Sequence, residues 1–111
     1  FTGLYKFSDG NVEVIKHQCV LTIDELVSEI NEEVIFLGDG VDAYRELIDS
    51  KMDVSHSFDR EDDNYVKASS FVYLAKDYFD AGKVISADDF RPDYLMLSQA
   101  ERELKEKQKN D

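Results

Sequence analysis

Residues 34–40 read VIFLGDG, and this stretch decides the fold class that the sequence predicts. Its first four residues form an unbroken apolar run, whereas a strand with one exposed face alternates apolar and polar residues. Three turn residues end the run, and an apolar pattern with helical spacing follows from Val41. Strand, glycine turn and helix in this order build parallel α/β sheets. We therefore predict an α/β domain in which residues 34–37 form a parallel central strand, buried on both faces.

Two β-like segments and a helix precede this strand. Residues 1–7 alternate in polarity, residues 12–20 are rich in β-branched side chains, and a Ser-Asp-Gly-Asn turn lies between them. This pattern predicts an antiparallel hairpin, so the expected sheet is small and mixed. Thr22 and Glu25 form a capping box, which opens a helix with one apolar face that ends near Asn31.

Three segments of different character follow the strand. A helix is predicted over about residues 42–50, and residues 51–66 lack any periodicity, which indicates a polar surface loop. The next helix is expected to open at Ser69 or Ser70 and to close at Gly82. Its apolar face is the widest in the sequence, so we expect this helix to be the main packing partner of the sheet.

A charged helix is predicted at the end of the chain. Ser98 and Glu101 form a second capping box, and the helical pattern extends to about Lys107. Its apolar side is narrow, and a short helix of this kind is marginal in water without a docking surface. We expect it to project, to fray, or to pack on another chain.

The composition limits the classes of function. The 111 residues supply one modest core, and the formal net charge is −12, from 25 acidic and 13 basic residues. An acidic surface repels a phosphate backbone, so we expect no direct nucleic-acid binding, and the charge favours a partner with a basic face.

The sequence shows neither a membrane-span pattern nor a signal-peptide pattern. No apolar run approaches the roughly 18 residues of a membrane span, and no signal-peptide pattern occurs. Cys19 is the only cysteine, which fits a reducing compartment, so the expected location is the cytoplasm. The chain begins at Phe1 within a strand-like pattern, and we therefore expect it to be a piece of a longer protein.

Catalytic and metal-binding patterns are weak. His17 and His56 lack the paired spacing that H-E-x-x-H peptidases need, and Cys19 is interpreted as a semi-buried thiol rather than a nucleophile. A calcium loop that starts at Asp59 would need glycine at its sixth position, where the sequence has Asn64. We interpret this segment as a solvated acidic loop, and we predict no metal ligands and no catalytic residues.

Gly38, Asp39 and Gly40 are the candidate site residues, because ligands of parallel sheets gather at the carboxyl ends of the strands. Two interpretations remain open for this turn. We favour plain turn and helix-capping chemistry, and the alternative is a contact with a nucleotide. No Walker loop and no G-x-S-x-G motif accompanies the turn, so we predict no cofactor.

Two stretches of the chain resemble the TsaB family, also called YeaZ, whose bacterial members are needed to form threonylcarbamoyladenosine in tRNA. They are FLGDGVDAYRELI at residues 36–48 and RPDYLMLSQAEREL at residues 91–104. The second stretch resembles the family pattern P-x-Y-L-R, with Met96 in place of the arginine. Residues 1–7 are similar to the strand that follows the family's D-A-R-R segment. The resemblance thus runs along the whole chain but covers only the second half of a family member.

The resemblance implies a fold and a domain arrangement. TsaB-like proteins belong to the actin-like ATPase superfamily, with two ribonuclease-H-like lobes, and residues 1–96 would form the second lobe. Residues 97–111 would then dock on the missing first lobe, through which homodimerisation is also expected. The turn at residues 38–40 resembles the superfamily's adenosine motif in degenerate form.

The resemblance also implies a function. It points to a non-catalytic scaffold that pairs with the catalytic protein TsaD and with the ATPase TsaE, although relatives often carry a glycoprotease, or peptidase M22, label. An enzyme is the alternative, either a peptidase or a nucleotide hydrolase that uses Asp39 and the loop carboxylates. A generic acidic protein-binding domain, unrelated to tRNA modification, is the third hypothesis.

Overall fold

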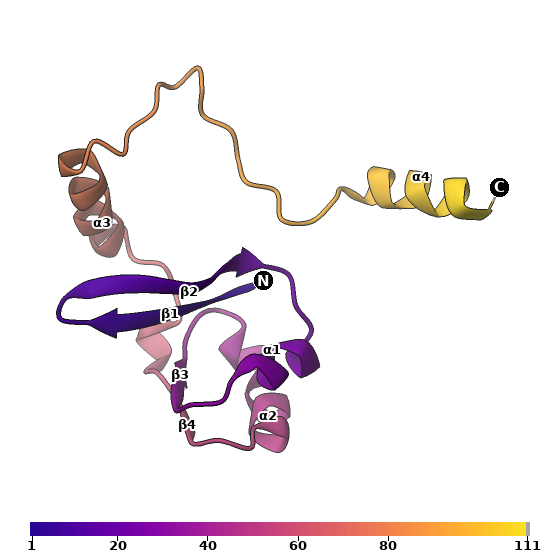
Figure 1. Cartoon of the computed structure of the whole chain (residues 1–111), viewed down its shortest axis with the longest axis horizontal. Coiled ribbons are helices and arrows are strands. Elements are labelled where there is room, and N and C mark those ends of the chain that lie inside the picture. Colours follow the sequence, from indigo (N-terminus) through magenta and orange to yellow (C-terminus); the bar gives the residue numbers. More distant parts are fainter. Residues whose placement is uncertain (111) are drawn as a thin grey trace. The chain divides into compact units, whose positions relative to one another are not determined.

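The computed structural model describes residues 1–110, which form a small mixed α/β protein with four α-helices and two separate two-stranded sheets (Figure 1). The predicted α/β class is confirmed at this level. The expectation of one mixed sheet is wrong, because the antiparallel and the parallel strands belong to different sheets. The chain divides into two units, one formed by Thr22–Phe90 and the other by Phe1–Leu21 with the residues from Arg91 onward.

The antiparallel sheet is the predicted hairpin. Strand β1, Thr2–Ser8, pairs with strand β2, Asn11–Cys19, so the hairpin is confirmed. The two residues of its turn, Asp9 and Gly10, have φ angles of 50° and 79°. A two-residue turn with positive φ at both positions matches the right-handed twist of the flanking strands, which explains the sharp return of the chain.

Helix α4, Gln99–Asn110, also lies in this unit and begins at the predicted capping box. The backbone N–H of Ser98 donates to Glu101 Oε2 at 3.0 Å, and the N–H of Glu101 donates to Ser98 Oγ at 3.3 Å. The capping box is therefore confirmed, and the helix extends three residues beyond the expected end. Leu104, on its narrow apolar side, is 56% exposed.

The parallel sheet lies in the other unit. Strand β3, Val34–Phe36, pairs in parallel with strand β4, His56–Phe58. The predicted parallel strand is thus confirmed, but its central position and its burial on both faces are wrong. Among the described residues β3 has one neighbouring strand, and Ile35 is 63% exposed. Because side chains alternate between the faces of a strand, the face that carries Ile35 is open.

Strand β4 falls inside the segment that was predicted to be a loop, so that prediction is wrong for residues 56–58. Three residues are too few to establish a period of two, and polar Ser57 lies at the centre of the strand. The half-buried face of the sheet is aromatic. The ring of Phe36 lies 6.1 Å from that of His56 and 5.7 Å from that of Phe58.

Helices α1, Ile23–Glu29, and α2, Val41–Lys51, supply the buried apolar side chains of this unit. Leu26, Val41 and Ile48 are between 4% and 6% exposed. The predicted capping box of α1 is present, because Thr22 and Glu25 exchange hydrogen bonds at the helix start. The small core therefore depends on these two helices.

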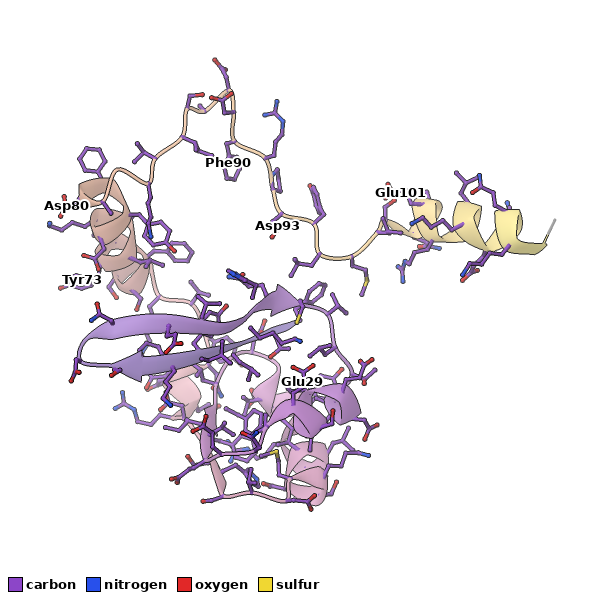
Figure 2. The ribbon with its side chains drawn as sticks, viewed as in Figure 1. Glu29, Tyr73, Asp80, Phe90, Asp93 and Glu101 are labelled. Carbon is purple, nitrogen blue, oxygen red and sulfur yellow. The ribbon has the colours of Figure 1, made fainter. Side chains whose placement is uncertain are left out.

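Helix α3, Ala68–Asp80, has no buried residue, so the prediction that it is the main packing partner of the sheet is wrong. Figure 2 shows its side chains projecting from the helix, among them Tyr73, which is 75% exposed. The apolar width of a helix shows that it needs a partner, but it does not show which surface provides the partner.

The sequence predicts the C-terminal end of α3 correctly but not its N-terminal end. The helix begins after Lys67, so Ser69 and Ser70 lie inside its first turn and the predicted cap is wrong. Gly82, with φ of 71°, closes the helix as predicted. Its N–H donates to the carbonyl of Phe79 at 3.0 Å, the arrangement expected at a glycine C-terminus.

No helix within residues 1–110 combines the length and the apolar character that crossing a bilayer requires.

Candidate functional site

The candidate site is the turn at residues 38–40, which joins β3 to α2. Gly38 has a φ angle of 118°, a backbone conformation that residues with a Cβ rarely adopt. A Cβ placed there would meet no atom within 4 Å, so space is not the constraint. Glycine is needed at this position because of the backbone angle alone.

Asn64 holds the turn from the loop after β4. The backbone N–H of Gly38 donates to Asn64 Oδ1 at 3.2 Å, and Asn64 is only 4% exposed. This contact fixes which end of the amide is the acceptor, and Nδ2 is left buried without a partner among the described residues. An unmatched buried donor of this kind costs about 1–3 kcal/mol. Sequence reasoning missed Asn64, because it placed this residue only in a polar loop.

The start of α2 is closed by the turn itself. The N–H of Val41 donates to the carbonyl of Gly38, and the N–H of Tyr44 donates to the carbonyl of Gly40, both at 3.1 Å. Gly40 is the N-cap residue, so the helix start has no side-chain cap. Asp39 is exposed. The turn and the helix start are therefore stabilised mainly by backbone hydrogen bonds.

Carboxylates give this end of the unit a negative field. The hydroxyl of Tyr65 donates to Asp42 Oδ2 at 3.1 Å. This hydrogen bond and the charge of Asp42 raise the pKa of Tyr65, and the carboxylates of Glu61 and Asp39 add to the effect. A phosphate group next to these three carboxylates would be repelled, which opposes the usual attraction of a helix N-terminus for anions. The electrostatics of the turn thus disfavour the nucleotide contact.

The loop carboxylates form ion pairs within the loop. Asp63 Oδ1 accepts from Lys67 Nζ at 2.8 Å, and Asp63 Oδ2 accepts from Arg60 Nε at 2.9 Å. These hydrogen bonds, that of Lys67 first, lower the pKa of Asp63. The N–H of Arg60 also donates to Asp59 Oδ1 at 2.8 Å. Within residues 1–110, no group of three or more His, Cys, Asp or Glu side chains is placed to hold a metal ion.

The remaining candidate residues lie on strands β2 and β4. His17 is exposed on β2. Cys19, at the end of the same strand, is a half-buried free thiol, as interpreted from the sequence. His56 lies on β4, where its ring contacts Asp49 of α2. The structure therefore brings Gly38 together with Asn64, and Asp42 together with Tyr65.

One comparison with known proteins finds a relative. The chain is similar to the tRNA threonylcarbamoyladenosine biosynthesis protein TsaB of Bacillus subtilis strain 168, with 27% identity over 112 residues. The aligned region covers 98% of this chain and 47% of that protein, so the chain spans about half the length of its relative. No protein-family model and no solved structure matches the chain. The similarity supports a TsaB-like relationship.

Proposed function

We propose that this chain is part of a TsaB-like interaction subunit that serves the formation of threonylcarbamoyladenosine in tRNA without catalysing a step. The observation that carries the proposal is the similarity to the TsaB protein of Bacillus subtilis, which extends over 98% of the chain. The proposal includes the finer fold assignment, a ribonuclease-H-like lobe of the actin-like ATPase superfamily.

The chemistry of the turn supports a role without turnover. Asp42 accepts a hydrogen bond from Tyr65, and Asp63 accepts hydrogen bonds from Arg60 and Lys67. Asp39 is exposed and has no neighbouring base in the turn. A general base or nucleophile acts through a partner within hydrogen-bond reach.

The charge of the chain supports a protein partner rather than direct contact with tRNA. A net charge of −12 repels the tRNA backbone and attracts a basic protein face. In our proposal the partners are a TsaD-like catalytic subunit and a TsaE-like ATPase, in the cytoplasm, and the half of the protein outside this chain mediates any homodimer.

Depletion of the gene tests the proposal. We expect the modified nucleoside, measured by mass spectrometry of digested tRNA, to fall when the gene is repressed. A copy that carries Asp39→Ala should restore the nucleoside as well as the unaltered copy does. An unchanged nucleoside level on depletion would refute the role in tRNA modification and favour the generic binding domain.

A nucleotide assay on the purified protein separates the scaffold from the enzyme. ATP and magnesium are titrated while phosphate release and the melting temperature are recorded. We expect no release by the protein alone. Partner-free turnover that disappears in Asp39→Ala would establish the nucleotide hydrolase instead, and partner-free cleavage of a glycoprotein substrate would establish the peptidase.

A further inference from the structure

His56 on strand β4 makes a polar contact through each nitrogen of its ring, one to helix α2 and one to the loop before β4. Nε2 lies 2.7 Å from Asp49 Oδ1, and Nδ1 lies 3.1 Å from the carbonyl oxygen of Val54. A carboxylate and a backbone carbonyl can only accept hydrogen bonds. Each ring nitrogen must therefore donate, which requires the doubly protonated, positively charged imidazolium.

The His56 ring is largely buried between aromatic side chains, next to charged groups of α2. The His56 side chain is 16% exposed, and its ring stands edge-on to Phe36 and Phe58, with interplanar angles of 80° and 88°. Helix α2 contributes the charge of Asp49, and its Arg45 lies 4.4 Å from the centroid of the Phe58 ring.

The chain around the two strands adds one more charged group. Glu33, directly before β3, has its Oε1 3.5 Å from Ser55 Oγ, in the residue before His56. Loss of the second ring proton would turn a nitrogen lone pair toward the oxygen of Asp49 or of Val54. That contact would then be repulsive instead of attractive.

We propose that the His56–Asp49 contact is a pH-sensitive latch, which clamps β4 to α2 while the imidazole holds both protons and releases β4 when one is lost. Strand β4 has three residues, and within the described residues it pairs with β3, so the His56–Asp49 contact adds a link from β4 to α2. The loop after β4 carries Asn64 to Gly38, and release of β4 therefore loosens the turn at residues 38–40.

The direction of the titration agrees with this geometry. The hydrogen bond that His56 donates to Asp49, followed by the one it donates to the carbonyl of Val54, raises the pKa of His56 above its ordinary value of 6.5. A raised pKa in the folded state means that the latch stabilises the fold fully below the unfolded-state value. The contribution is lost as the pH rises through the folded-state pKa.

Nuclear magnetic resonance of the uniformly ¹⁵N-labelled protein tests the latch between about pH 5 and about pH 9. We expect His56 to lose its proton at a higher pH than the same residue in urea-unfolded protein. The amide resonances of Gly38 and Asp59 should shift with the same midpoint, because both donate hydrogen bonds that depend on the position of β4.

Three substitutions complete the experiment. Asp49→Asn should lower the midpoint of His56, and His56→Gln should abolish the pH-dependent shift of the Gly38 amide. Asp24→Asn is the control. It removes the ion pair between Asp24 Oδ1 on α1 and Lys51 Nζ on α2, which lie 2.5 Å apart, and it should leave the titration of His56 unchanged. If His56→Gln does not fold, Asp49→Asn alone decides the result. An unfolded-like midpoint in the native protein, or a Gly38 amide that ignores the titration of His56, would overturn the proposal.

Discussion

The backbone N–H of Gly38 donates a hydrogen bond to the side-chain oxygen of Asn64, 26 residues later in the chain, at 3.2 Å. This contact ties the end of β3 to the loop that follows β4. Asn64 is also the one buried polar residue among those described, so the turn and the loop depend on each other.

Replacement of Asn64 by alanine should lower the free energy of unfolding by about 1–3 kcal/mol, because the Gly38 N–H loses its acceptor in a buried setting. The loss should lie toward the lower end, since the substitution also removes the unmatched Nδ2. Urea unfolding measures the change. Asn31→Ala, at an exposed position, is the matched control and should change stability by less than about 0.5 kcal/mol. Equal effects of the two substitutions would contradict the structural role of Asn64.

Gly38→Ala should destabilise the protein by about 1–3 kcal/mol, because the φ angle of 118° is strained for any residue with a Cβ. Gly40→Ala provides the comparison in the same turn. Gly40 has a φ angle of −73°, and an added Cβ would meet only Tyr44 at 3.8 Å. This substitution should be neutral or stabilising by up to about 1 kcal/mol. Thermal unfolding of both variants checks the difference, and the opposite order would show that the turn has a different conformation.

Ile48→Ala should lower the free energy of unfolding by about 2–5 kcal/mol, because Ile48 is 4% exposed and the loss of its side chain leaves a cavity in the small core. Phe79→Ala removes a larger side chain from α3, where Phe79 is 72% exposed. The free energy of unfolding of that variant should lie within about 0.5 kcal/mol of that of the original protein. Urea titrations compare the two. A larger loss for Phe79→Ala would mean that α3 is buried in solution.

The capping box of α1 should respond to acid. The hydrogen bonds from the backbone and the hydroxyl of Thr22 lower the pKa of Glu25 below its ordinary value of 4.5. A lowered pKa in the folded state gives a contribution that is present above the unfolded-state value and lost as the pH falls through the folded-state value.

Melting curves between about pH 2 and about pH 7 test this behaviour. Glu25→Gln should melt below the original protein near neutral pH, and the difference should shrink in acid. Glu46→Gln, at an exposed position of α2, removes the same charge without a capping bond and should show no such convergence. A difference that stays constant down to the acid end would contradict the prediction.

Residues 34–40 follow their sequence pattern in local structure but not in burial. The pattern of residues 34–40 predicted a parallel strand and a glycine turn, and both are present. The same pattern predicted burial on both faces, and the exposure of Ile35 contradicts it. An apolar run shows that a strand is suited to burial, whereas the neighbours that bury it come from other parts of the chain.

In other parts of the chain, too, local features were predicted and contacts between distant segments were not. The hairpin, both capping boxes and the glycine end of α3 were predicted correctly from residues no more than a few positions apart. The three-residue strand β4, the partner of Gly38 and the exposure of α3 were not predicted. The partnership of His56 with Asp49 was also missed, although the two residues are seven positions apart.

The sequence by itself determined the local elements of this protein, because a cap, a turn or a helical stripe depends on atoms within one or two turns of the chain. Only the tertiary structure decided that Val34 pairs with His56 and that Gly38 binds Asn64. Pairings across 20 or more residues depend on which segments meet when the chain closes, and many such closures differ little in loop entropy. The residue pattern of one segment cannot select among them.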